Sequence, residues 1–308
     1  MTCSIHISHV SKRYAASGVQ ALQDISFDVG HGELFGIIGP DGSGKTTLFR
    51  ILATLLLADT GEVTVCGNDV QKSYKVIRNI VGYMPGRFSL YQDLTVEENI
   101  RFFATIFNTT LEEKYHLIKD IYVQLEPFKK RRAGKLSGGM KQKLALCCAL
   151  IHEPQVLLLD EPTTGVDPVS RKEFWHMLDI FKKKGITILV STPYMDEAAR
   201  CDRIALMQKG KILDIDTYAG ILKRHARPLL AVRASSMYRL LLDLREYDNC
   251  ESCYSFGSVH HVLLKTHSAD HVTELKRFLI DRGYQDSSVE DVHPDIEDVF
   301  IDLMANVA

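Results

Sequence analysis

The stretch Gly-Pro-Asp-Gly-Ser-Gly-Lys-Thr at residues 39–46 decides the fold class of this 308-residue chain. It fits the pattern G-x-x-x-x-G-K-[ST] at every fixed position. An apolar run at residues 34–38 leads into this glycine loop, and residues 46–57 behind it read as a helix. Strand, glycine loop and helix together form the context in which this pattern binds phosphate. We therefore expect a nucleotide site rather than a glycine-rich turn that binds nothing.

The residue types of this loop fit the chemistry of a nucleotide. Glycines let the backbone curve closely, so that successive N–H groups point at the β-phosphate, and the following helix adds its positive end. Lys45 is expected to reach the β- and γ-phosphates, and the Thr46 hydroxyl to ligate Mg²⁺. The predicted nucleotide-binding residues of this segment are Gly39, Pro40, Asp41, Gly42, Ser43, Gly44, Lys45, Thr46 and Thr47.

A second motif is a pair of carboxylates, Asp160 and Glu161, which directly follows an apolar run at residues 156–159. Continuous apolar runs of this kind are typical of parallel strands buried on both faces, and residues 186–190 form another. Ligands of open α/β sheets bind at the carboxyl ends of the strands. We therefore expect Asp160 to hold Mg²⁺, directly or through water, and Glu161 to polarise the attacking water as the catalytic base.

Composition narrows the class of protein. With 45% hydrophobic and 25% charged residues the chain is an ordinary globular protein, and its length favours two domains. A net charge of −2 gives no general attraction to nucleic acid, and none is expected as a partner. No apolar run of about 18 residues occurs, and residues 1–14 lack a signal-peptide core. Seven scattered cysteines favour a reducing, cytoplasmic compartment.

The order of patterns predicts two domains, at residues 1–222 and 229–308. In the first, strands alternate with helices, and helical periodicity at residues 94–151 indicates an inserted helical subdomain at about 87–151. Residues 223–228 read as a linker. The second domain reads β-α-β-β-α-β followed by a helix, the order of a small ferredoxin-like α+β domain. The predicted strands of this domain are 229–232, 253–256, 262–264 and 289–292, and its predicted helices are 237–244, 271–280 and 296–304.

The predicted second domain carries few chemical signals. Cys250 and Cys253 form a lone C-x-x-C without two further ligands, which favours thiols on a half-buried strand over a zinc site. His260 and His261 are adjacent on a predicted strand and must point to opposite faces, so we expect scattered surface histidines. Stabilisation of a dimer or regulation is the only role that we assign to this domain.

A glycine pair opens a second helix at residues 136–142, Leu-Ser-Gly-Gly-Met-Lys-Gln. Such a helix start binds anions, and one nucleotide does not need two such cradles from one chain. We therefore expect Ser137, Gly138 and Gly139 to contact a nucleotide that a second subunit holds. Together with Gln142, this signature resembles that of ATP-binding-cassette (ABC) transporter ATPases, and it argues against kinases and GTPases that share the phosphate loop.

The resemblance covers about residues 4–222 and implies an α/β P-loop NTPase fold with a RecA-like core, an antiparallel β subdomain and a helical subdomain. It implies ATP and Mg²⁺ as cofactors. Tyr14 sits where such cassettes stack an aromatic ring on adenine, although an aromatic cap of a strand end is an alternative. Residues 163–168 match the D-loop, whose Asp167 contacts the opposite subunit.

Residues 83–99 resemble the multidrug-export type of cassette, which serves a membrane permease encoded separately, and residues 298–303 resemble the end of such subunits. This implies an ATP-hydrolysing subunit that drives export from the inner face of the cell membrane. The permease is expected in a groove near residues 86–91, with apolar contacts from Phe88, Leu90 and Tyr91. A soluble cassette acting on ribosomes or DNA is the alternative, and a purely structural nucleotide-binding subunit is a third.

Two positions depart from the family pattern. Gly86 stands where the family has a glutamine that ligates Mg²⁺, and Pro193 where it has a histidine that donates to the γ-phosphate. One lost donor typically costs about 10²–10³ in rate, although two losses in one site do not simply add. We expect firm ATP binding, slow hydrolysis and an asymmetric heterodimer with a second cassette. An ordinary symmetric ATPase that relies on Glu161 is the alternative.

Overall fold

The computed structural model describes residues 3–225 and 227–307, and the chain divides into two compact units, Met1–Tyr218 and Ala219–Ala308. Residues 1, 2 and 308 of the predicted domains and residue 226 of the predicted linker lie outside the described residues. The linker prediction is wrong at its start, because α7 (Tyr218–His225) continues through residues 223–225.

The first unit contains an antiparallel sheet and a mainly parallel one. The antiparallel sheet has the order β2-β1-β4-β5. Alternating burial along β2 accounts for the alternating sequence there. Strands predicted at residues 5–10 and 25–29 are confirmed within its first two members. The four strands are β1 (Cys3–Arg13), β2 (Gln20–Gly30), β4 (Thr60–Val65) and β5 (Asn68–Asp69).

The second sheet positions the predicted site. Its order is β10-β9-β3-β8-β7-β6, and all neighbours are parallel except the edge pair β9 and β10. Ile38 pairs with Thr192 and Asp160 with Ser191, so the carboxyl ends of the three central strands meet at one edge. The strands are β3 (Leu34–Ile38), β6 (Val81–Met84), β7 (Val156–Asp160), β8 (Thr187–Thr192), β9 (Arg203–Gln208) and β10 (Lys211–Asp216).

Three helices of the first unit pack near this sheet. The helix predicted at residues 46–57 is shorter, because Thr54 takes a left-handed φ of 60° directly after it. Helix α2 is a short helix that leads into the edge strand β6, and α6 packs against β8. The helices are α1 (Lys45–Leu52), α2 (Tyr74–Ile80) and α6 (Pro168–Lys183).

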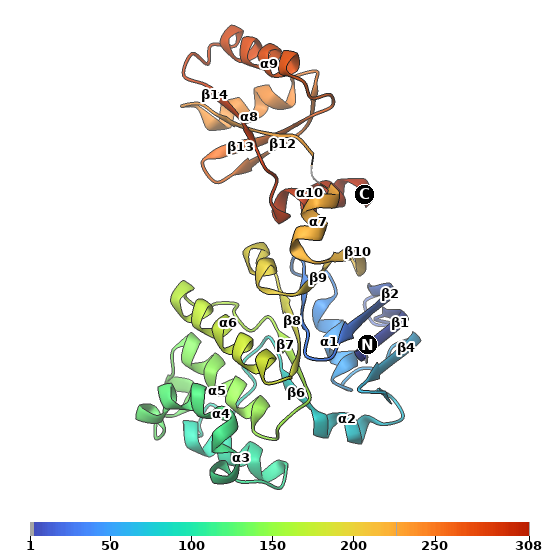
Figure 1. Cartoon of the computed structure of the whole chain (residues 1–308), viewed down its shortest axis with the longest axis vertical. Coiled ribbons are helices and arrows are strands. Elements are labelled where there is room, and N and C mark those ends of the chain that lie inside the picture. Colours follow the sequence, from blue (N-terminus) through green and yellow to red (C-terminus); the bar gives the residue numbers. More distant parts are fainter. Residues whose placement is uncertain (1–2, 226, 308) are drawn as a thin grey trace. The chain divides into compact units, whose positions relative to one another are not determined.

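Three helices lie together over the residues predicted as a helical subdomain, green in Figure 1. Capping boxes at Thr95 and Thr110 fix where the first two begin, and the Ser137 hydroxyl caps the third. Two 3-10 turns, Glu126–Phe128 and Ala133–Lys135, join the second helix to the third. The helices are α3 (Val96–Ile106), α4 (Leu111–Leu125) and α5 (Gly138–Leu150).

The second unit has the strand order β12-β13-β11-β14, antiparallel throughout. This is the ferredoxin-like arrangement, in which the first strand of the βαββαβ unit lies between the third and the fourth. Leu240, Leu244, Leu275 and Leu279 of its first two helices bury one face of the sheet. The elements are β11 (Leu229–Arg233), α8 (Met237–Arg245), β12 (Cys250–Phe256), β13 (Val259–Leu264), α9 (Ala269–Asp281), β14 (Ser288–Val292) and α10 (Ile296–Val307).

His260 and His261 point to opposite faces of this sheet, but both are buried, so the expectation of surface histidines is wrong. The ring of His260 donates from Nε2 to the Met237 carbonyl at the start of α8, over 2.7 Å. His261 Nδ1 lies 2.6 Å from Asp298 Oδ1 on α10. The prediction failed because α8 covers His260 on one face of the sheet and α10 covers His261 on the other. Among the described residues, no helix has the length and apolar composition to cross a membrane.

Candidate nucleotide-binding site

The phosphate loop joins β3 to α1, and close packing explains its glycines. Gly42 and Gly44 have left-handed φ angles of 76° and 111°. A Cβ on Gly39 would lie 2.1 Å from the Met207 carbonyl oxygen, and one on Gly44 would lie 2.4 Å from the Ala21 carbonyl oxygen. Any larger residue would push the loop off its neighbouring strands, so the sequence pattern is also a packing requirement.

Lys45 brings a positive charge into this loop. Its ammonium group is buried, donates to the carbonyl oxygens of Gly39 and Pro40 over 2.7 and 2.9 Å, and lies 3.1 Å from Glu161 Oε1. The lysine thus bridges the phosphate loop and the end of β7. This ion pair places the predicted phosphate ligand and the predicted base side by side.

A cavity of about 360 Å³ opens at this point. It is lined from the phosphate loop, from the end of β7 and from the segment after β1, where the Tyr14 hydroxyl lies 3.3 Å from Thr47 Oγ1. The aromatic and the phosphate cradle therefore share one cavity, as a nucleotide with its base and phosphates requires. The predicted residues that line it are Tyr14, Asp41, Gly42, Gly44, Lys45, Thr46, Thr47 and Glu161.

Two polar atoms next to the cavity, one in the phosphate loop and one at the end of β7, test whether these segments suit an anion and a cation. The Ser43 hydroxyl is buried in the loop without a hydrogen-bond partner among the described residues. Buried polar groups without partners are rare and call for a ligand or water, so an anionic oxygen fits here. Asp160 is 1% exposed, and the Ser191 hydroxyl donates to its Oδ1 over 2.7 Å. No described residue donates to its Oδ2, which leaves one carboxylate oxygen for a cation.

Glu161 has a backbone conformation that non-glycine residues seldom adopt, with φ of 50°. Its N–H donates to the Ser191 carbonyl oxygen and hydroxyl, over 3.1 and 2.9 Å. Strained residues of this kind persist only where contacts hold them. Sequence reasoning missed Ser191, whose signal was a polar residue at the end of a buried strand next to β7.

The two departures from the family pattern lie at Gly86 and Pro193. A Cβ on Gly86, two residues after β6, would lie 3.2 Å from the Asp160 carbonyl oxygen. Pro193 follows Thr192, whose carbonyl oxygen accepts from the Gly39 N–H over 3.2 Å. Neither Gly86 nor Pro193 has a side-chain donor to offer a phosphate or an attacking water.

The glycine pair at the start of α5 lies away from the cavity around Lys45 and packs on the start of α6. A Cβ on Gly139 would lie 2.6 Å from Ser170 Oγ, and one on Gly138 would lie 3.2 Å from the Gly165 carbonyl oxygen. Asp167 caps α6 by accepting from the Ser170 N–H, and this hydrogen bond lowers the pKa of Asp167. Gln142 is half-buried one turn along α5. The start of the signature helix and the segment of residues 163–168 thus pack against each other.

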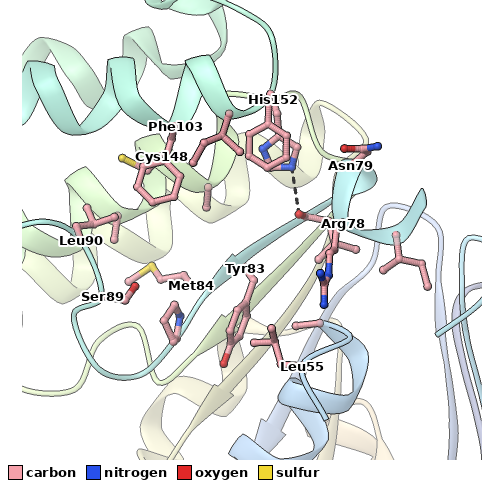
Figure 2. A pocket seen from close by; sticks show the side chains of 18 residues that line it. Leu55, Arg78, Asn79, Tyr83, Met84, Ser89, Leu90, Phe103, Cys148 and His152 are labelled. Atoms are coloured by element: carbon pink, nitrogen blue, oxygen red, sulfur yellow. Dashed lines mark hydrogen bonds between the residues drawn. The ribbon is translucent and has the colours of Figure 1, made fainter. Parts of the chain in front are cut away.

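A second cavity, of about 500 Å³, lies between the sheet and the helical subdomain (Figure 2). Its walls are mostly apolar, and Arg78 is its one permanently charged lining residue. His152 stacks on Phe107 with 3.9 Å between ring centroids and donates from Nε2 to the Val81 carbonyl. Burial lowers the pKa of His152, so its neutral form is favoured. Apolar lining residues include Tyr83, Met84, Leu90, Phe103 and Cys148.

Three residues were predicted as apolar contacts of a permease in this region, and they lie differently with respect to the cavity. Leu90 lines the cavity, but Phe88 and Tyr91 do not. Lys141 Nζ on α5 lies 5.6 Å from the centroid of the Phe88 ring, and Tyr91 packs edge-on against Phe102. Both aromatics therefore belong to the helical subdomain's own surface rather than to the wall of the groove.

Known proteins resemble this chain in sequence. The sequence model of a family described as "ABC transporter" matches residues 22–164. The probable multidrug ABC transporter ATP-binding protein YbhF of Escherichia coli (strain K12) is 37% identical over 97% of this chain and 52% of its own length. The Nod factor export ATP-binding protein I of Rhizobium sp. (strain N33) is 36% identical over 72% of this chain and 73% of its own.

Solved structures agree with these sequence relatives. An ATP-binding subunit of an ABC transporter superposes with a TM-score of 0.65 at 27% identity, over 71% of this chain and 92% of its own. A dimeric, post-hydrolysis ATP-binding cassette, MJ0796 bound to ADP and Pi, superposes with a TM-score of 0.63 at 25% identity, over 69% of this chain and 98% of its own. This chain spans about half the length of the E. coli relative. With the phosphate loop, the signature and these relatives in agreement, the chain belongs to the ABC transporter family.

Proposed function

We propose that this chain binds ATP with Mg²⁺ in the cavity around Lys45, turns it over slowly, and acts with a second cassette to drive export through a membrane permease. The observation that carries the proposal is a complete phosphate cradle beside two strand ends that lack donors, at Gly86 and Pro193. Thr46 and Asp160 would hold the Mg²⁺, which when bound offsets the charge of the phosphates.

In this proposal Glu161 is the base and Lys45 the phosphate ligand. Their ion pair of 3.1 Å means that a bound phosphate and Glu161 compete for the same ammonium group. The Ser191 hydroxyl and carbonyl hold the Glu161 backbone while its side chain changes partner. Orientation of the attacking water then depends on Glu161, since positions 86 and 193 contribute no side-chain donor.

A second cassette is proposed because Ser137, Gly138 and Gly139 lie outside this chain's own cavity. Ser137 and Gly138 are exposed at the start of α5, where a helix N-terminus is suited to an anion. Asp167 and the segment before α6 lie beside them. The dimeric form of the MJ0796 cassette supports this arrangement, and the departures at positions 86 and 193 favour a heterodimer.

The apolar groove of Figure 2 is the proposed permease site, which would place the chain at the inner face of the membrane. Its walls suit the apolar face of a helix. Arg78 binds the Thr54 hydroxyl and carbonyl rather than a carboxylate, so an acidic residue of the permease would find a cation there. The relatives' names favour transport over action on ribosomes or DNA.

One sample of the full chain tests the function. Calorimetry should give saturable ATP binding, and phosphate release by the same sample should fall below about 1 s⁻¹, the low end of usual kcat values. Turnover at the rate of an ordinary cassette would contradict the degenerate site. In Glu161→Gln the remaining turnover should drop further, and an unchanged rate would mean that this site binds ATP without hydrolysing it.

The transport assignment has its own test. The full chain, expressed from its natural locus with an affinity tag, should co-purify with an integral membrane subunit. A charge reversal in the groove, Arg78→Glu, should reduce this recovery while ATP affinity stays unchanged, and Lys184→Glu on a different surface is the matched control. Recovery with ribosomes instead would support the soluble alternative.

A further inference from the structure

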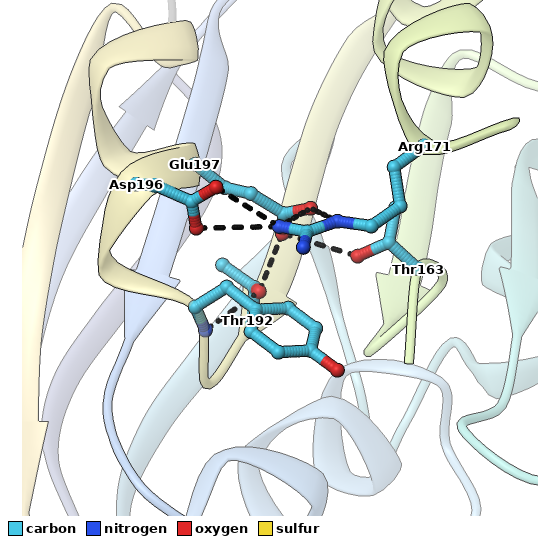
Figure 3. Close-up of polar contacts among 6 residues, drawn as sticks. Thr163, Arg171, Thr192, Asp196 and Glu197 are labelled. Atoms are coloured by element: carbon cyan, nitrogen blue, oxygen red, sulfur yellow. Dashed lines mark hydrogen bonds and ion pairs between the residues drawn. The ribbon is translucent and has the colours of Figure 1, made fainter. Parts of the chain in front are cut away.

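A buried polar cluster lies behind the nucleotide site and is centred on Glu197 (Figure 3). The Glu197 side chain is 4% exposed. Its Oε2 accepts from the Thr192 hydroxyl over 2.5 Å and from the Thr163 hydroxyl over 3.1 Å, and its Oε1 accepts from Arg171 Nε over 3.1 Å. Three chain segments thus meet on one carboxylate. We call these four residues the Glu197 cluster.

Each partner of Glu197 belongs to a different part of the site. Thr192 ends β8, and its carbonyl oxygen accepts from the N–H of Gly39, the first residue of the phosphate loop. Thr163 stands two residues after Glu161. Arg171 lies on α6, one turn behind the Asp167 cap. The cluster therefore joins the phosphate loop, the end of β7 and α6 through buried hydrogen bonds.

The connection continues from α6 to the signature helix. Ser170 precedes Arg171, and a Cβ on Gly139 at the start of α5 would lie only 2.6 Å from the Ser170 hydroxyl oxygen. A shift of α6 at this point would therefore displace the start of α5, because side chains packed this closely leave no slack. One continuous path runs from the phosphate loop to the signature.

Charge makes Glu197 the member of the cluster that matters most. Its carboxylate takes three hydrogen bonds in a buried setting, where such contacts are strong and directional. Arg171 also contacts Asp196, but that carboxylate is 75% exposed and touches neither threonine. Pro193 has no donor, so the hydroxyl of Thr192 makes the polar link from the end of β8.

We propose that Glu197 is a positioning residue that transmits ATP binding at the phosphate loop to α6 and the signature helix. The proposal rests on the proposed function, because the signature faces a partner's nucleotide only in that arrangement. A chain that hydrolyses its own ATP slowly would in this way still report its occupancy to the partner's site.

The chain carries a built-in probe for this coupling. Trp175 is its one tryptophan, lies one turn beyond Arg171 on α6, and is 3% exposed. Its indole N–H has no hydrogen-bond partner among the described residues. We expect the Trp175 emission of the full chain to change on saturation with the non-hydrolysable analogue AMP-PNP and Mg²⁺, while calorimetry on the same sample gives the affinity.

Glu197→Gln breaks the cluster, since one amide cannot accept from both Arg171 and the two threonines. We expect most of its emission change to be lost, with nucleotide affinity within about threefold of the unmodified chain. Asp196→Asn is the matched control and should keep most of the change. Should Glu197→Gln not fold, Thr163→Val tests the same link and should also lower the emission change.

The outcomes separate the two proposals. An unmodified chain that binds no nucleotide contradicts the proposed function itself. Binding without any change in Trp175 emission, or an equal change in the unmodified chain, Glu197→Gln and Thr163→Val, overturns only the role of Glu197. Equal losses in Asp196→Asn and Glu197→Gln would also overturn it, because the effect would then follow the charge around Arg171.

Discussion

The phosphate loop and the ends of β6 and β8 lie beside each other but are built in opposite ways. The loop packs so closely against β9 and β2 that Gly39 and Gly44 leave no room for a side chain, and it brings the buried ammonium group of Lys45. Gly86 is exposed and Pro193 is only half-buried. Neither offers a side-chain donor. The first region is the proposed nucleotide cradle, and the second lacks the glutamine and the histidine that the family pattern has at positions 86 and 193.

The difference shows which parts of such a site can be lost without loss of the fold. A side chain at Gly39 or Gly44 would clash with the neighbouring strands, so these two glycines are required for folding as well as for the phosphate cradle. Side chains at exposed strand ends contribute little packing, and their loss leaves the sheet intact. Binding and hydrolysis can therefore separate in one chain, and three experiments test this separation.

The largest effect is expected from restoring the second region. Gly86→Gln combined with Pro193→His should raise the turnover of the full chain by about 10²–10³, the value of a preorganised donor, measured as phosphate release. Gly86 has no left-handed φ in this structure, so a side chain is compatible with its backbone. Its Cβ would lie 3.2 Å from the Asp160 carbonyl, so the loop must yield slightly.

Gly86→Ala is the control for that close contact, because it adds the Cβ without a donor. We expect it to leave turnover at the low starting rate. No gain in the double variant, when Gly86→Ala folds and binds ATP normally, would mean that the missing donors do not limit hydrolysis.

The second experiment attacks the first region. Lys45→Ala removes the cation that contacts the phosphates, and we expect the Kd for ATP to rise by about 100-fold, which corresponds to about 2.7 kcal/mol. Calorimetry of the full chain measures it. Lys211→Ala is the control, because it removes a cation of the same kind from an exposed position that does not line the cavity. Equal affinities for Lys45→Ala and the unmodified chain would remove Lys45 from the site.

Local patterns predicted the loop, the strands before it and beside it, and the helical subdomain, because glycine spacing and apolar periodicity are encoded within short segments. Contacts between distant segments were not predicted. Ser191 holds Asp160 only because β7 and β8 lie side by side in register. His260 is buried under α8, where it binds the Met237 carbonyl, and His261 is buried under α10, where it contacts Asp298, 37 residues further along the chain.

The smallest effect is expected at the border of the two regions, where Ser191 connects β8 to Asp160. Ser191→Ala removes the hydroxyl that donates to Asp160 Oδ1 and accepts from the Glu161 N–H. A hydrogen bond to a charged group contributes about 1.5 kcal/mol or slightly more. If Asp160 holds the metal ion, ATP affinity in the presence of Mg²⁺ should fall by about tenfold or slightly more, while affinity in EDTA stays unchanged.

Thr187→Val is the matched control for this variant, because it removes a buried hydroxyl from the opposite end of the same strand, where Thr187 binds Ser4 and the Gly32 N–H. It should affect stability but neither affinity. Equal losses of affinity with and without Mg²⁺ in Ser191→Ala would assign the serine to the phosphate cradle. The border between the two regions would then lie beyond β8, and Asp160 would need another partner to orient it toward a cation.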